Sequence, residues 1–337
     1  TKSGARVDGA MTVLKIAIVV FVVIVGFFYV KASNFTPFIP PSQPAAATTG
    51  DGAVSAQMAQ PLWQWATGMT PSIYGVPGIL SGAALVFFAF LGFDVVATAS
   101  EETKNPHKNV PLGIGVGMLL IIVMYMLVAI VTTGMVSYKD LAKQDSPSLA
   151  TAFELVGADW AAKIISFGIV LGLATVIMVL LLGLTRIVFA MSRDGLLPRG
   201  LSKTGKHGTP AVLQIVVGVV VALVAALFDI GVLSDMVNIG TLSAFTLVAI
   251  SIPIMRKNRP ELPRAFRMPG NPWVPILIAL ANFWLMLNLS VLTWIRFLVW
   301  LVIGFAIYFS YGYWHARLGK GDLSETLSDE TDRAVNG

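Results

Sequence analysis

Residues 87–106, FFAFLGFDVVATASEETKNP, combine features that do not belong together in a passive membrane anchor. The stretch begins as an apolar run, yet Gly92 and Asp94 interrupt the run, and Glu101 and Glu102 follow it. A charge inside a membrane span is costly, so an ionisable residue there is a functional candidate. What this stretch does depends on whether a bilayer surrounds it.

The composition indicates a membrane protein. Of the 337 residues, 56% are hydrophobic and only 12% are charged, which is more apolar surface than a soluble core can hide. Cysteine is absent and the three histidines are scattered, so the sequence predicts no disulfide, metal site or cofactor. No Ser-His-Asp arrangement or phosphate loop stands out, which argues against an enzyme. We therefore predict an all-α polytopic membrane protein in contact with the lipid bilayer.

Eight apolar runs are long enough to cross a bilayer as helices, which takes about 20 residues each. The runs lie near residues 10–30, 74–100, 110–136, 161–185, 211–228, 236–255, 273–291 and 294–313. Between the first two runs, residues 31–73 are rich in Pro, Ala, Thr and Gly, and we expect an external loop with little packed structure. The tail, residues 314–337, is acidic and expected to be disordered.

Basic residues between the runs fall on alternate sides of the membrane, which is the signal that sets orientation. The cations in these cytoplasmic segments are Lys2, Arg6, Lys104, Lys108, Arg193, Arg199, Lys203, Lys206, Arg256, Lys257, Arg259, Arg264 and Arg267. Both ends of the chain are therefore predicted to be cytoplasmic. The net charge of +5 is explained by the basic residues that set the orientation in the membrane. The sequence has no basic patch interleaved with aromatic residues, so we expect no nucleic-acid binding.

A break in the second span, around 89–92, would explain the glycine and the carboxylate of the opening stretch. Unwound backbone is tolerated in a membrane only where it is buried in protein or lines a cavity. The carbonyl groups of Phe88, Ala89 and Leu91 could then bind a ligand ammonium group, and Asp94 could cap the second half-helix. Broken helices of this kind form the binding sites of secondary transporters. The alternative is a continuous helix in which Gly92 only permits close packing.

Lys15 is the other ionisable residue well inside an apolar run, MTVLKIAIVVF. A coupling role is one interpretation, because burial disfavours the charged form of a lysine and allows it to exchange a proton. The alternative is that the side chain extends to the cytoplasmic interface, about 10 Å away along the helix axis near Asp8.

Several separated motifs carry a family resemblance. FFAFLGFDVVATASEETKNPHKNVPLGI, TRIVFAMSRDGLLP, NIGTLSAF and RPELPRAFRMP occur in this order. Together they resemble the cationic amino acid transporter branch of the amino acid, polyamine and organocation permeases. This resemblance implies a LeuT-type fold of two inverted five-helix repeats with two further spans, and import of amino acids, often with protons, across the plasma membrane.

On that resemblance, the eight runs correspond to the family's fifth to twelfth spans. Residues 1–30 would then be the last span of the first repeat. Residues 74–255 would form the second repeat, and residues 273–313 the two additional spans. The family's first four spans have no counterpart here, and the resemblance implies that the first of them binds the substrate carboxylate through the free amides of a glycine-rich break. We expect the missing spans, from a longer parent chain or a partner, to be needed for transport.

The resemblance also implies roles for individual residues. Phe88 resembles the aromatic gate over the substrate, and Asp94 resembles the acid beside the unwound turn. Lys15 resembles the lysine that replaces a sodium ion in proton-coupled members. Tyr125 and Leu180 resemble pocket positions. Each has a structural alternative, namely packing for the apolar and aromatic side chains and capping for Asp94.

Arg186, Arg193 and Asp194 fall in the cytoplasmic motif and are interpreted as gate or loop-fastening residues, or as solvated charges. The predicted function is an amino-acid permease, with proton-coupled transport of a small or medium neutral amino acid. The alternatives are a non-transporting membrane scaffold or receptor, and a cationic amino acid or polyamine exchanger.

Overall fold

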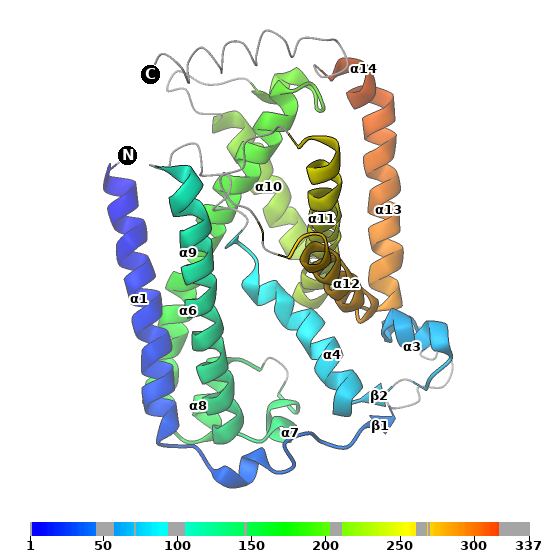
Figure 1. Cartoon of the computed structure of the whole chain (residues 1–337). Helices are drawn as coiled ribbons and strands as arrows, with labels where there is room; N and C mark the ends of the chain where they lie inside the picture. The colour runs from blue at the N-terminus through cyan, green and yellow to red at the C-terminus, as the bar shows by residue number, and fades with distance from the viewer. Residues whose placement is uncertain are drawn as a thin grey trace.

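Figure 1 shows the chain, a computed structural model, as a set of long helices joined by short helices and loops. The structure describes residues 2–44, 57–70, 72–93, 105–144, 147–202, 211–260, 268 and 270–316. Asp94, Glu101, Glu102 and the tail from residue 317 lie outside the described residues, as does part of the external loop, residues 45–56.

Each of the eight apolar runs contains a helix. The long elements are α1 (Lys2–Phe27), α4 (Gly75–Val86), α6 (Pro106–Met135), α9 (Asp159–Arg193), α10 (Ala211–Leu227), α11 (Ile230–Asn258), α12 (Trp273–Leu287) and α13 (Val291–Ile307). The short elements are η1 (Ala32–Phe35), β1 (Gln43–Pro44), α3 (Leu62–Thr67), β2 (Ser72–Ile73), η2 (Phe87–Phe90), α7 (Tyr138–Leu141), α8 (Leu149–Leu155), η4 (Arg199–Ser202), the π-helix η5 (Tyr308–Gly312) and α14 (Tyr313–His315). The all-α prediction is confirmed.

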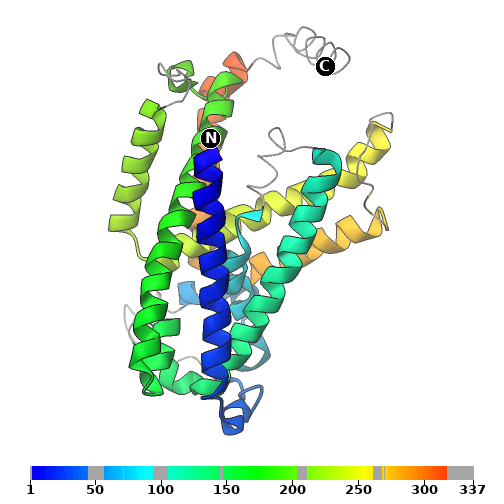
Figure 2. The same ribbon diagram turned by 90° about the vertical axis from the view of Figure 1, so that its left-hand side faces the viewer.

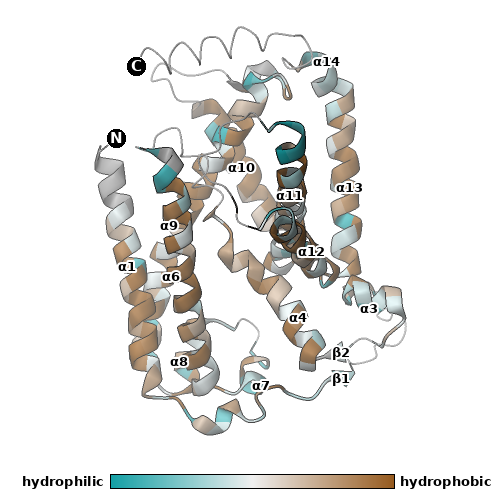
Figure 3. Cartoon of the chain, in the orientation of Figure 1, coloured by the Kyte–Doolittle hydropathy of each residue, from teal (hydrophilic) through white to brown (hydrophobic). Residues whose placement is uncertain are grey.

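Five helical stretches in the described part are long and apolar enough to cross a membrane. They are Gly9–Phe27, Lys108–Met135, Asp159–Arg193, Ile230–Asn258 and Val291–His315. Three other apolar helices are shorter, at 10–17 residues: Gly75–Phe90, Ala211–Leu227 and Trp273–Leu287. Figure 3 shows apolar residues along the outer faces of these helices, which suits lipid as the surrounding solvent. The chain is a multi-pass membrane protein.

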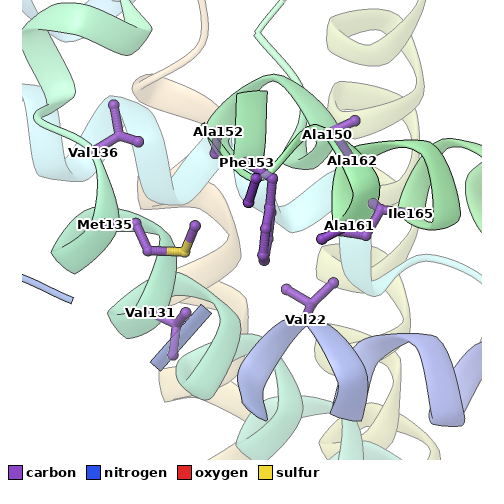
Figure 4. Packing of buried hydrophobic residues seen from close by; sticks show 11 residues of the cluster. Val22, Val131, Met135, Val136, Ala150, Ala152, Phe153, Ala161, Ala162 and Ile165 are labelled. Carbon is purple, nitrogen blue, oxygen red and sulfur yellow. The ribbon is translucent and has the colours of Figure 1, made fainter. Parts of the chain in front are cut away.

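The helices form two groups, each with its own core. In the first group, α1 lies between α6 and α9, as Figure 2 shows from the side of α1. Its core gathers side chains from α1, α6, α8 and α9, with the ring of Phe153 between Val22 and Met135 (Figure 4). The second group packs α4, α11, α12 and α13 around Ile239 and Leu242.

A small residue allows the closest approach within the first group. At Gly168 of α9, a Cβ atom would overlap three atoms of the Ile18 side chain on α1. Glycine at this position therefore lets the two helices pack at a separation that a larger residue would prevent, as is common between membrane helices.

The segment of residues 31–73 is better packed than the sequence predicts. Helix α3 lies against the turn between α12 and α13, and β1 pairs with β2 in an antiparallel ladder. Trp63 stacks on Trp284 with ring centroids 6.3 Å apart, and its indole donates a 3.0 Å hydrogen bond to Asn288. The prediction of little packed structure over residues 31–73 is wrong for α3, because partners distant in sequence bury it.

Candidate functional site

The second span is broken at the predicted place. The α-helical geometry of α4 ends at Val86 and tightens into the 3₁₀ turn η2, after which Leu91 is extended with φ −65° and ψ 146°. Gly92 follows with φ +114°, a backbone conformation that residues with a Cβ rarely adopt. The sequence thus breaks the helix locally through a glycine, and the prediction of a broken helix near 89–92 is confirmed.

Tyr125 of α6 holds the broken segment from the side. Its hydroxyl donates a 2.8 Å hydrogen bond to the carbonyl oxygen of Ala89. Its ring makes an edge-on contact with Phe90, with centroids 5.1 Å apart. Tyr125 is therefore fixed to both the backbone and a side chain of η2, although the two segments are 36 residues apart in the sequence.

The carbonyl groups at the break are less free than predicted. The Phe88 carbonyl accepts a 3.2 Å hydrogen bond from the Leu91 amide, because the 3₁₀ turn closes back on itself. The Ala89 carbonyl accepts the hydrogen bond from Tyr125. A carbonyl oxygen has two lone pairs, so each of these groups can still accept a second donor. Binding of an ammonium group by Phe88 and Ala89 therefore stays a prediction, with one lone pair of each carbonyl left for it.

Helix α11 supports the other side of the break. Phe245 makes ring contacts with Phe87 and Phe93, at centroid distances of 6.2 and 5.3 Å. The fully buried Asn238 donates a 3.3 Å hydrogen bond to the Leu85 carbonyl, one turn before the 3₁₀ segment. Sequence reasoning assigned no role to Asn238 and Phe245, although both lie in the motif NIGTLSAF.

The remaining predicted residues lie at different places. Phe88 is on the broken segment with 44% of its surface exposed. Leu180 lies on α9 and is 47% exposed. The structure brings Tyr125 and Ala89 together, and a pocket role for Leu180 stays a prediction. Asp94 lies outside the described residues.

Lys15 lies in the interface between α1 and α9. Its aliphatic chain passes Gly172, where a Cβ atom would come 3.9 Å from the Lys15 Cε atom. The hydroxyl of Thr175, one turn further along α9, donates a 2.8 Å hydrogen bond to the Gly172 carbonyl. The aliphatic part of the lysine side chain therefore lies against α9 beside Gly172.

The motif TRIVFAMSRDGLLP contains an exposed ion pair and a buried hydrogen bond. Arg193 and Asp194 pair with each other at 3.5 Å, and both side chains are exposed, so the pair adds little stability. The loop is held instead by Ser192, which is fully buried and donates a 2.7 Å hydrogen bond to the Pro198 carbonyl. Gly195 has φ +83° and packs against the His315 backbone, which leaves no room for a side chain.

An apolar helix interrupted at a glycine is typical of the discontinuous helices that form the binding sites of secondary transporters. A family model described as "Amino acid permease" matches residues 1–313. The chain belongs to the amino acid permease family. The resemblance to that superfamily is confirmed, whereas the correspondence to the fifth to twelfth spans and the inverted repeat stay predictions.

Individual relatives agree with the family match. The chain is 41% identical over 320 residues to the branched-chain amino acid permease BcaP of Bacillus subtilis (strain 168), covering 95% of this chain and 62% of the relative. It is 38% identical to the methylthioribose transporter of the same organism, with the same coverage of both chains. Cationic amino acid transporter 3, mitochondrial, of Arabidopsis thaliana is 44% identical over 191 residues, covering 56% of this chain and 31% of the relative. The chain thus spans about three fifths of the length of the two Bacillus relatives.

Proposed function

We propose that the chain is part of a permease that moves an amino acid across the plasma membrane by alternating access. The observation that carries the proposal is the break at Gly92, held by the hydrogen bond between Tyr125 and Ala89. A break of this kind exposes main-chain groups that a continuous helix keeps for itself. Those groups can replace water around a charged ligand inside a membrane.

In this proposal the substrate amine binds at the broken segment. The carbonyls of Phe88 and Ala89 keep one lone pair each for the ammonium group, and Leu91 adds a third carbonyl in the extended turn. The half-exposed ring of Phe88 is available to cover the apolar part of the ligand. Tyr125 keeps the turn open by fixing the Ala89 peptide.

The substrate carboxylate needs hydrogen-bond donors from elsewhere. The described part of the broken segment offers it chiefly carbonyl oxygens, which repel an anion. Because the Bacillus relatives are longer than this chain, we propose that spans outside the 337 residues supply amide groups to the carboxylate. Both chain ends are proposed to face the cytoplasm, consistent with the first residues of α1 and helix α14 lying at the same end of the molecule (Figure 1).

Lys15 is the proposed proton carrier. Its aliphatic chain lies against Gly172 in the α1–α9 interface, and the residue is partly buried. Loss and gain of a proton there would change the charge in the interface between α1 and α9. Such a change can couple the proton gradient to the movement of these helices.

We favour a small or medium neutral amino acid as the substrate. Phe88, Tyr125 and Phe90 are aromatic, and no carboxylate among the described residues lies at the break to meet a cationic side chain. Two similar proteins from bacteria are branched-chain amino acid permeases, which supports the same preference.

The test is uptake by the full-length protein in proteoliposomes with an imposed proton gradient. Radiolabelled leucine is offered together with an excess of alanine, leucine, lysine or arginine. The proposal predicts saturable, gradient-dependent uptake of leucine that neutral amino acids inhibit more strongly than cationic ones. Displacement by arginine alone would overturn the substrate preference, and uptake no greater than in empty vesicles would overturn transport.

A further inference from the structure

A pocket with mainly apolar walls lies outside the broken segment, at the end of the molecule opposite the start of α1. It has a volume of about 620 Å³ and is lined by α3 and its preceding turn, the residues before α4 and one face of α4, the start of α11 and the turn between α12 and α13. Pockets of this size are typical of sites for small molecules. None of the residues proposed above to bind the substrate lines it.

Two buried amides present oxygen atoms without a partner here. Gln64 is 1% exposed and Gln60 is 8% exposed, and both line the pocket. Within the described residues, the Oε1 atoms of both side chains accept no hydrogen bond. Both oxygens are buried from solvent, and a buried acceptor left unsatisfied costs about 1–3 kcal/mol. Rotation of either side chain toward the pocket would let a ligand donate a hydrogen bond to the oxygen and recover that energy.

A carboxylate completes the set of acceptors. Asp235 of α11 lines the same pocket, and its Oδ2 atom accepts a 3.1 Å hydrogen bond from the fully buried Thr293 of α13. Arg296, one turn further along α13, acts on Asp235 electrostatically but does not line the pocket. The described lining contains no lysine or arginine. The pocket therefore favours a cation and disfavours an anion.

We propose that this pocket is an outer binding site for an organic cation, namely a primary ammonium or a guanidinium group. Asp235 supplies the counter-charge, and Gln60 and Gln64 accept the hydrogen bonds of the cationic group. Ala59, Leu85 and Leu289 give the pocket apolar walls that suit a short carbon chain. An amine with a small apolar body matches all of these features.

The position of the pocket suggests how it serves the permease. Gly78, Ser81 and Leu85 line it from one face of α4, and Phe88 follows on the next turn of the same segment. Asn238 bonds to the Leu85 carbonyl between the pocket and the break. A substrate held by its amine in this pocket would lie one helical turn from the broken segment. This role as an entry site rests on the proposed transport function, whereas recognition of the cation does not.

The experiment measures binding by isothermal titration calorimetry to the full-length protein in nanodiscs. Three probes are used: 3-methylbutylamine, which has an ammonium group, agmatine, which adds a guanidinium group, and 4-methylpentanoate, which has only a carboxylate. The variants are Asp235→Asn, which keeps an oxygen for Thr293, and Gln60→Leu, which removes an unpartnered oxygen. The matched control is Asp229→Asn, because Asp229 is exposed at the start of the same helix and does not line the pocket.

We expect both amines to bind to the wild type and 4-methylpentanoate not to compete with them. Asp235→Asn should weaken amine binding about tenfold or more, Gln60→Leu should weaken it several-fold, and Asp229→Asn should leave it unchanged. The stronger of the two amines identifies which cationic group the pocket prefers. Gln60→Leu should also keep or raise the melting temperature, because it removes a buried unsatisfied oxygen, whereas loss of a purely structural residue would lower it.

Amine binding that is absent in the wild type, or equal in the wild type and Asp235→Asn, would overturn the proposal. If Asp235→Asn does not fold, the test rests on Gln60→Leu. Amine binding that is unchanged in Gln60→Leu would then overturn the proposal. Leucine uptake measured on the same preparations separates the two proposals. Protein that takes up no leucine but binds amines through Asp235 would refute the transport function and leave the cation site standing.

Discussion

The hydroxyl of Tyr125 donates a 2.8 Å hydrogen bond to the carbonyl of Ala89, joining the middle of α6 to the break in the second span. Gly92 creates the break by adopting a backbone conformation that other residues avoid, and Tyr125 holds the tightened turn before it. The geometry of this segment therefore depends on a local feature, the backbone conformation of Gly92, and on a long-range contact, the hydrogen bond from Tyr125.

Removal of the Tyr125 hydroxyl should weaken substrate binding. Tyr125→Phe keeps the ring contact with Phe90 but loses one neutral hydrogen bond, so the affinity for leucine should fall about three- to tenfold. The measurement is a leucine titration of the full-length protein. Tyr313→Phe on the exposed α14 is the matched control. Equal affinities in Tyr125→Phe and the control would show that this hydrogen bond does not organise the site.

Gly92→Ala should be costly for conformational reasons alone. Among the described residues, no atom lies within 4 Å of a Cβ built at Gly92, but φ +114° is strained for alanine by about 1–2 kcal/mol. We expect slower leucine uptake and a lower melting temperature. Gly82→Ala, at an equally open position inside α4, should be neutral or stabilising because alanine favours helix. The same loss of stability in both variants would contradict a special role for the conformation at position 92.

The α1–α9 interface should be sensitive to a single methyl group. Gly168→Ala would push against Ile18 and should lower the free energy of unfolding by about 1–3 kcal/mol. Gly172→Ala, one turn away, reaches only ordinary contact with Lys15 and should be tolerated. Adding Ile18→Ala to Gly168→Ala should restore part of the lost stability, as a double-mutant cycle of thermal unfolding would measure. Additive losses in that cycle would rule out direct contact between the two positions.

Lys15→Ala should separate binding from energy coupling. In the full-length protein we expect this variant to bind leucine but to lose accumulation driven by a proton gradient, because the titrating ammonium group is gone. Lys31→Ala is the control, since Lys31 is exposed in the turn between α1 and η1. Fully concentrative uptake by Lys15→Ala would exclude Lys15 as the proton carrier.

The helices and the break could be predicted because their causes are local. Lipid requires long apolar runs, and each predicted run contains a helix. Gly92 interrupts its run in a way that the residue type itself reveals, since glycine tolerates positive φ.

The partners in the site could not be predicted because they are distant in sequence. Tyr125 was a candidate through the family resemblance alone, and nothing in its own sequence context indicates that it bonds to Ala89. The same holds for Gln64, which looks like a polar loop residue but becomes buried when Trp63 docks on Trp284. The composition of residues 31–73 indicates an exposed loop, and Gln64 is buried only because α3 packs against helices that are distant in sequence.

Site-directed labelling of the broken segment tests directly whether substrate binds there. The 337 residues contain no cysteine, so Phe88→Cys introduces a single reactive thiol in this part of the protein, and Phe167→Cys on the exposed face of α9 provides the control. The rate of maleimide labelling is measured with and without saturating leucine in a full-length protein without other cysteines. Binding at the break predicts that leucine slows labelling at position 88 several-fold and leaves position 167 unchanged. Leucine binding by the Phe88→Cys variant with equal labelling rates at position 88 in both conditions would place the substrate elsewhere.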